Sequence, residues 1–197
     1  MAQPVPVPFT MGKEEALYPA PQQDLALVFA ENFTGLQGRF SFCSSYAELV
    51  AQLNQLADTR NWQQIYCREE GIKHLLASAG FMNYTATALH DCDASITTCE
   101  LLVARTGSIL MSSAQQSGRT TSVYAPVHIC IAYMSQLVYD IKDGLQLLKD
   151  KYADAFPSLI TLATGPSRTA DIEKTLVVGV HGPKEVFCFL IDDSVTA

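Results

Sequence analysis

Polar and basic residues gather after an apolar run at positions 159–163, and their types suit the binding of a small anion. Hydroxyls, backbone N–H groups at a helix start and a guanidinium can together hold a phosphate or a carboxylate. Thr169 is the expected N-cap of a short helix that ends before a second turn. The residues that would form or flank this small-anion or cofactor site are Gly165, Pro166, Ser167, Arg168, Thr169, Asp171 and Glu173.

The same stretch also reads as a good helix start that has no ligand. Asp171 and Glu173 favour that reading, since two carboxylates in the first turn partly neutralise the helix dipole. The second turn places His181 between Gly179 and Gly182, where an imidazole suits ligand binding or proton transfer. A stop signal for the helix is the alternative use of these glycines.

Two further groups are candidates for chemistry. Glu100 follows an expected strand end, where open α/β sheets place their ligands, so its carboxylate is a candidate nucleophile. An exposed acid in a helical turn is the competing interpretation of Glu100. Thr106, Gly107 and Ser108 form a loop whose hydroxyls and N–H groups suit an anion, or which is simply a tight turn.

The elements that must position these residues alternate between strand and helix, which predicts an α/β fold. Apolar runs predict strands at 27–29, 64–67, 95–98, 109–112, 127–132, 159–163 and 186–191. The runs at 159–163 and 186–191 are continuously apolar, which is typical of strands covered on both faces in a parallel sheet, and 127–132 is also expected as a buried strand. Helical periodicity predicts helices at 46–58, 69–79 and 134–152, besides the short one after Thr169. The strands at 95–98 and 109–112 are expected to form a hairpin-like pair around a single helical turn. Gly144, inside the third helix, is expected at a close packing contact.

The stretch Gly165 to Pro183, with Thr98 to Ser108 and the Ala125-Pro126-Val127-His128 region, resembles the lactate-utilisation (LUD) domain family. The resemblance implies a three-layer α/β/α domain with a mostly parallel sheet, like that of the NagB/RpiA/coenzyme A transferase group. Residues carried over by motif match are Thr106, Gly107, Gly165, Pro166, Ser167, Arg168, Thr169, Asp171, Glu173, His181, Gly182 and Pro183. The chain departs from the family pattern at Cys99-Glu100, where Gly-Ala is common, and at Ser108, where Thr is usual.

The resemblance also implies a cytoplasmic component that supports oxidation of L-lactate to pyruvate beside iron–sulfur redox proteins. The six cysteines form no C-x-x-C pair, so no metal site is predicted here and any cluster is expected on partner subunits. Whether this chain is an enzyme stays open. The alternatives are an enzyme resembling coenzyme A transferases or formyltetrahydrofolate cyclo-ligases, with an anionic or nucleotide substrate, and a non-catalytic ligand-binding module.

Composition narrows the class of partner. The net charge of −7 argues against nucleic-acid binding, which needs a basic face. No apolar run reaches the roughly 18 to 20 residues that a membrane-spanning helix requires. Residues 1–24 hold five of the nine prolines and are expected to form an extended arm, while 25–197 form one domain. Such an arm is compatible with a homodimer in which it lies over a partner subunit.

Overall fold

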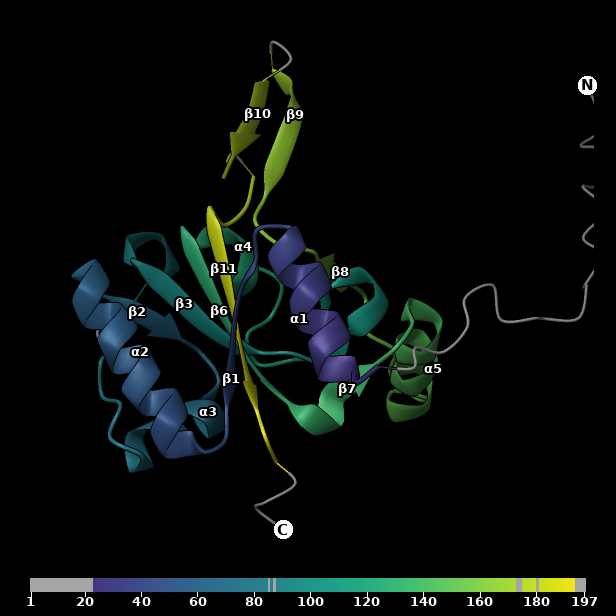
Figure 1. Cartoon of the computed structure of the whole chain (residues 1–197), viewed down its shortest axis with the longest axis horizontal. Helices are drawn as coiled ribbons and strands as arrows, with labels where there is room; N and C mark the ends of the chain where they lie inside the picture. The colour runs from purple at the N-terminus through teal and green to yellow at the C-terminus, as the bar shows by residue number, and fades with distance from the viewer. Residues whose placement is uncertain (1–22, 85, 87, 173–174, 180, 194–197) are drawn as a thin grey trace, which may run out of the picture.

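The computed structural model describes residues 23–84, 86, 88–172, 175–179 and 181–193 (Figure 1). The helices are α1 (Leu25–Gly35), α2 (Tyr46–Arg60), α3 (Glu70–Ser78), α4 (Thr121–Tyr124) and α5 (Ile141–Lys151), with 3-10 turns at Leu89–Asp91, Ala104–Thr106 and Met134–Gln136. The strands are β1 (Arg39–Cys43), β2 (Ile65–Cys67), β3 (Ala94–Thr98), β4 (Leu101–Val103), β5 (Ser108–Ser112), β6 (Val127–Tyr133), β7 (Leu137–Val138), β8 (Ile160–Ala163), β9 (Arg168–Ile172), β10 (Thr175–Val178) and β11 (Glu185–Ile191).

A five-stranded parallel sheet in the order β1-β11-β6-β3-β2 forms the centre of the fold. Its middle strands β6 and β11 are buried along nearly their whole length, with Cys130 in register with Cys188. This burial explains why both sequences are continuously apolar rather than alternating. Because helices pack against the sheet, the predicted α/β fold with a mostly parallel sheet is confirmed.

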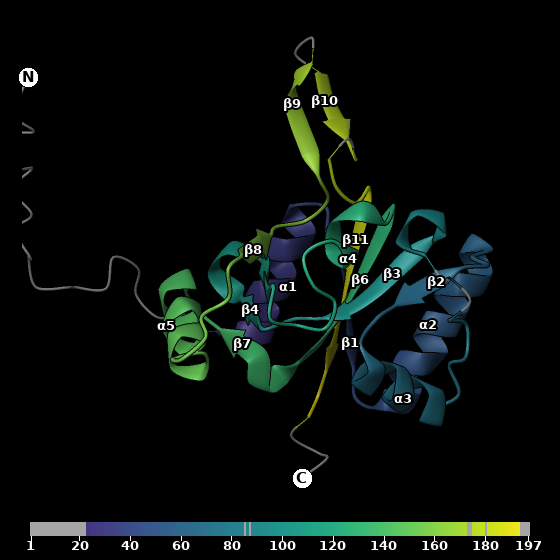
Figure 2. The ribbon, with the colours of Figure 1, turned by 180° about the vertical axis from the view of Figure 1, so that it is seen from behind.

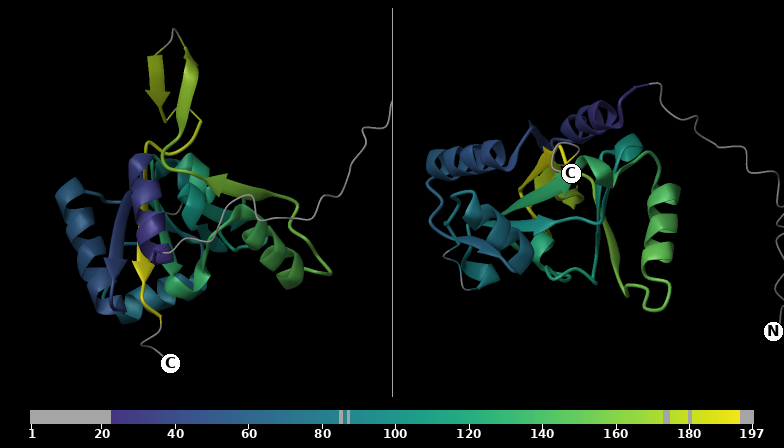
Figure 3. Two further views of the ribbon diagram at one scale, coloured as in Figure 1. Left: turned by 45° about the vertical axis from the view of Figure 1, so that its right-hand side comes forward. Right: turned by 90° about the horizontal axis from the view of Figure 1, so that it is seen from below.

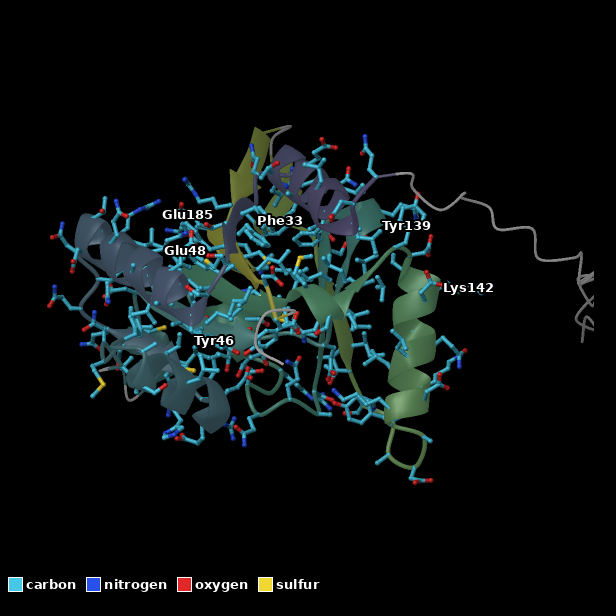
Figure 4. All side chains as sticks on the ribbon, turned by 60° about the horizontal axis from the view of Figure 1, so that its bottom comes forward. Phe33, Tyr46, Glu48, Tyr139, Lys142 and Glu185 are labelled. Atoms are coloured by element: carbon cyan, nitrogen blue, oxygen red, sulfur yellow. The ribbon has the colours of Figure 1, made fainter. Side chains whose placement is uncertain are left out.

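Side chains from α2 and α3 cover one face of this sheet and form one core with it. The other face packs on α1 and on a second sheet of order β7-β4-β5-β8, which is mostly antiparallel. Helix α5 closes the far side of the second sheet, as the two views of Figure 3 show. Phe33 of α1 lies fully buried between these layers (Figure 4).

The expected strand at 27–29 is wrong, because these residues belong to α1. The Asp24 carboxylate accepts a hydrogen bond from the Ala26 N–H at 2.7 Å and caps this helix. Phe29 and Phe33, one turn apart, stack with ring centroids 5.3 Å apart and are fully buried. An apolar triplet fits either element, and here the four-residue spacing of the two phenylalanines decides for the helix.

The third predicted helix begins later than expected. Residues 134–136 form a 3-10 turn and Leu137–Val138 pair with β4, so only residues 141–151 are α-helical. A capping box between Asp140 and Asp143 starts the helix. Gly144 does lie at a close contact, since a Cβ there would be 3.3 Å from Leu110 Cδ1.

Two strand pairings also differ from expectation. The strands at 95–98 and 109–112 do not form a pair, because β3 lies in the central sheet and β5 in the second one. The expected helical turn between them is largely strand β4, whose apolar residues pair with β5. The run at 159–163 is an edge strand antiparallel to β5, not a buried parallel strand, and Leu162 is 40% exposed.

Candidate functional site

The stretch after Thr169 is a β-hairpin, so the short helix predicted there is wrong. Strand β9 pairs antiparallel with β10, with Arg168 opposite Val178. The hairpin projects away from both sheets (Figures 1 and 2). The sequence Thr175-Leu176-Val177-Val178 is rich in β-branched residues, which favour a strand over a helix. Thr169 and Asp171 lie on β9, whereas the predicted ligand residue Glu173 lies outside the described residues.

Without a helix there is no helix N-terminus at which an anion would bind. Any ligand role of the 165–173 loop therefore depends on its side chains and on the base of the hairpin. That base, which we call the neck, comprises residues 165–168 and 178–184 apart from Val180.

The neck brings the two predicted turns together. The Ser167 N–H donates to the Pro183 carbonyl at 2.9 Å, and the Gly179 N–H donates to the Ser167 carbonyl at 2.9 Å. A Cβ at Gly182 would lie 2.9 Å from Ser167 Cβ, so only glycine allows this approach. A helix of about ten residues would have held the two turns roughly 15 Å apart, whereas the hairpin places them side by side.

Backbone conformation and packing explain why position 165 is a glycine. Its φ is +78°, and a Cβ there would be 2.4 Å from the Leu36 carbonyl oxygen, so the position excludes other residues. Gly165 and Pro166 are both buried, which leaves Ser167 half-buried and Arg168 exposed at the surface of the neck. Packing alone accounts for the glycines, while the exposed side chains remain available to a ligand.

A cavity of about 340 Å³ opens beside the neck, lined by Val123, Tyr124, Gly179, His181 and Gly182. His181 is exposed, and Tyr124 of α4 is 71% exposed. Tyr124 was not predicted, because only the folded chain brings α4 against the neck. This opening is the neck cavity.

Two cationic residues, Arg168 and Lys184, belong to the neck but are not among the residues that line its cavity. Lys184 is exposed and packs against Gly179. The backbone N–H of Lys184 donates to the Pro126 carbonyl at 2.8 Å. Arg168 is exposed beside Ser167 on the other arm of the neck. Together with the exposed His181, these residues give the neck groups that attract or hydrogen-bond an anion.

The loop of Thr106, Gly107 and Ser108 is a tight turn against α1. Gly107 has φ +59°, and a Cβ there would be 2.5 Å from Phe33 N. Ser108 is 2% exposed, and its hydroxyl bonds Thr106 Oγ1 at 2.7 Å and Thr164 Oγ1 at 2.8 Å. This hydroxyl chain brings the turn next to the start of the neck, but a ligand role for its residues stays a prediction.

Glu100 is not the exposed acid of the competing interpretation, because its side chain is only 2% exposed. Its Oε1 accepts hydrogen bonds from Ser112 Oγ at 2.6 Å and Tyr152 Oη at 2.8 Å, and its Oε2 accepts one from Lys151 Nζ at 2.8 Å. Burial raises the pKa of the Glu100 carboxyl, but these donors outweigh burial and leave the pKa below its ordinary value. The carboxylate thus anchors the end of α5 to the junction of the two sheets. A nucleophilic role would require these bonds to be released.

Glu69 is a second buried carboxylate, which sequence reasoning missed. It accepts hydrogen bonds from the N–H of Thr98, at 2.9 Å, and from the Thr98 hydroxyl. Its position just after β2 is the available signal, since side chains that follow parallel strands meet at one sheet edge. A cavity of about 350 Å³ lies here, lined by Glu69, Gly71, Ile72, Thr98, Cys99, Glu100, Gln115, Gln116, Lys151 and Tyr152.

The neck cavity and the cavity beside Glu69 lie at opposite ends of the parallel strands of the central sheet. The neck precedes β11, whereas Glu69 and Glu100 follow β2 and β3, and all these strands are parallel. The carboxyl edge, where the parallel strands end and where Glu69 and Glu100 lie, is the usual ligand position in open α/β sheets. In this chain the carboxyl edge carries the carboxylates of Glu69 and Glu100 and the ammonium of Lys151, which together disfavour an anion. The cationic residues of the neck favour one.

His128 is structural in this fold. It is fully buried on β6, and its Nε2 lies 2.9 Å from Thr97 Oγ1. Burial lowers the pKa of His128 to about 4, so the ring is neutral at pH 7. Among the described residues no group bonds its Nδ1.

Within the described residues, no group of three or more His, Cys, Asp or Glu side chains is arranged to hold a metal ion. Over the same residues, no helix has the length and apolar character needed to cross a membrane.

Residues 77–191 match the family model of the LUD domain. Lactate utilization protein C of Bacillus licheniformis is 36% identical over 100 residues, which are 50% of this chain and 42% of that protein. The chain thus spans less than half of that relative's length. Lactate utilization protein C of Shouchella clausii is 25% identical over 193 residues, 91% of this chain and 84% of that protein. The crystal structure of a DUF162 family protein from Deinococcus radiodurans shares the fold, with a TM-score of 0.63, 18% identity and coverage of 88% of this chain and 99% of that one.

Proposed function

Because the chain belongs to the LUD domain family, we propose that it acts in a lactate-utilisation system and supports the oxidation of L-lactate to pyruvate. The family match over residues 77–191, with relatives named lactate utilization protein C, is the observation that carries this proposal. The system would be cytoplasmic and would include iron–sulfur proteins. Oxidation of lactate to pyruvate releases two electrons, which clusters on those partners would accept, and two protons, which would pass to water.

The neck is the proposed binding site for the small anion, a carboxylate such as L-lactate or pyruvate. Arg168 and Lys184 supply positive charge, and a guanidinium can bind a carboxylate through two parallel hydrogen bonds. His181 at the cavity rim would bond the hydroxyl of lactate or the keto oxygen of pyruvate. The choice of the neck over the carboxyl edge rests on charge, since Glu69 and Glu100 would repel the ligand.

Calorimetric titration of the full chain with L-lactate, D-lactate, pyruvate and inorganic phosphate tests the proposal. Replacement of Arg168 by Gln removes a charge-assisted bond worth about 1.5–3 kcal/mol, so the Kd should rise at least tenfold. Lys149→Gln is the matched control, since Lys149 is an exposed cation on α5, and its Kd should equal that of the wild type.

Equal affinity in the Arg168 and Lys149 variants would contradict the neck as the site. Binding that is lost in Lys151→Gln but kept in Arg168→Gln would move the site to the carboxyl edge. Binding of phosphate in preference to either carboxylate would contradict lactate or pyruvate as the ligand.

A further inference from the structure

Strand β1 is an edge strand with an open side. It pairs with β11 on one side, and the described residues place no strand on its other side. Figure 1 shows β1 between α2 and α1 on the near side of the molecule. Phe42 in this strand is 44% exposed. Such an edge presents unpaired N–H and C=O groups that readily accept another strand.

A groove of about 540 Å³ runs beside β1 on the side of α2, and it is larger than either candidate pocket. Its apolar lining includes Leu56, Phe187 and Phe189. Gln52 and Gln55 of α2 add polar groups to the same groove. The Arg39 guanidinium lies over the Phe187 ring, with Cζ 5.5 Å from its centroid. An extended segment beside β1 could place apolar side chains on Leu56 and towards Phe189 while its backbone pairs with the strand.

The segment Pro4-Val5-Pro6-Val7-Pro8-Phe9 has the pattern that this edge requires. In a strand, successive residues direct their backbone groups to alternate edges and their side chains to alternate faces. Val5, Val7 and Phe9 therefore direct their N–H groups to one edge and place three apolar side chains on one face. The prolines occupy the other edge, where a missing donor is tolerated only if no further strand pairs.

The chain is long enough to connect this segment to β1. Residues 10–24 join it to α1, and they span at most about 50 Å when extended. Helix α1 is about 16 Å long, and only residues 36–38 separate it from β1. The segment can therefore return along the length of α1 to the open edge.

We propose that residues 4–9 add to the open edge of β1 in the same chain, with Val5, Val7 and Phe9 facing the groove beside α2. The central sheet then has six strands. Its new outer edge carries prolines, which cannot donate to another strand and so prevent edge-to-edge association.

Amide hydrogen exchange across residues 37–45 of the full chain tests this proposal. Val7→Pro removes a donor aimed at β1 but keeps the segment extended, so the β1 amides that face away from β11 should exchange at least tenfold faster. Thr10→Pro is the control, because residue 10, like Pro4, Pro6 and Pro8, would direct its N–H away from β1. This variant should leave the exchange of the β1 amides as in the wild type.

Equal exchange rates in the wild type and both variants would overturn the proposal, as would equal acceleration in both variants. The assay is repeated over a hundredfold range of protein concentration. Protection that is independent of concentration supports pairing within one chain. Protection that appears only as the chain dimerises would assign the edge to a second copy and would also overturn the proposal.

Discussion

Replacement of Glu100 by Gln tests whether this carboxylate is an anchor. The Gln carbonyl can still accept from Ser112 and Tyr152, so the main loss is the charge-assisted bond from Lys151. A hydrogen bond to a charged group contributes about 1.5–3 kcal/mol. Lys151 is 60% exposed and can turn to water, which relieves part of the cost of leaving it unpaired. We therefore expect the free energy of unfolding to fall by about 2 kcal/mol.

Urea unfolding followed by the fluorescence of Trp62, the single tryptophan, measures this change. A loss of about 2 kcal/mol shifts the urea midpoint by roughly 1 M and lowers the Tm by about 4–8 °C. Glu70→Gln is the matched control, because Glu70 is 75% exposed and bonds Lys73 at 2.8 Å. An exposed pair of this kind contributes less than about 1 kcal/mol.

The pH dependence provides the sharper test of the Glu100 anchor. Since the folded pKa of Glu100 lies below its ordinary value, its contribution is complete above the unfolded pKa of about 4.3. The contribution is lost as the pH falls through the folded pKa, so the gap between wild type and variant should be smaller at pH 3 than at pH 7. A gap of the same size at both pH values, or no gap at pH 7, would refute the ionised anchor.

Two further predictions concern backbone conformation and a buried base. Gly107→Ala should lower the free energy of unfolding by more than about 2 kcal/mol, because its Cβ meets Phe33 N at 2.5 Å. Gly71→Ala, whose Cβ meets nothing within 4 Å, should raise it by about 0.5–1 kcal/mol. Paired urea titrations of the two variants compare them, and equal effects would contradict the packing argument. As the pH falls from 6.5 to 4, His128 takes up a proton in the unfolded state while the buried ring of the folded state stays largely neutral, so His128 alone should lower the free energy of unfolding by about 3 kcal/mol. Urea titrations at several pH values should find the fall in the free energy of unfolding smaller by this amount in His128→Gln, and the same fall in both proteins would contradict the assignment.

Local signals in the sequence predicted the parts of the fold that depend on local chemistry. The pattern Ser45-Tyr46-Ala47-Glu48 favours a helix start, and the Ser45 hydroxyl accepts from the Glu48 N–H at 3.3 Å as the N-cap of α2. The apolar runs of β6 and β11 were predicted as covered strands because two buried faces leave no room for alternation. Local signals do not predict which distant segments pair. The main example is β5, which lies in the second sheet instead of pairing with β3.

In the candidate site, too, local patterns indicated the chemistry of single residues but not the pairings and contacts that the folded chain creates. The chemistry around Thr169 suits a helix cap, yet the antiparallel pairing of Arg168 with Val178 makes the stretch a hairpin. No local pattern foretold that Tyr124 would line a cavity with His181. The burial of Glu100 was equally hidden, because its donors Lys151 and Tyr152 lie about fifty residues away in sequence.

The position of β11 has a consequence for how the molecule acquires its structure. β11 follows every other described strand in sequence but lies between β1 and β6, with Arg39 in register with Phe187. Until residues 185–191 are synthesised, β1 lacks the strand that joins it to β6 and to the rest of the central sheet. Such distant pairing raises the contact order and slows folding. The nascent chain therefore has a prolonged interval in which aggregation competes with folding, and binding by chaperones is most useful then.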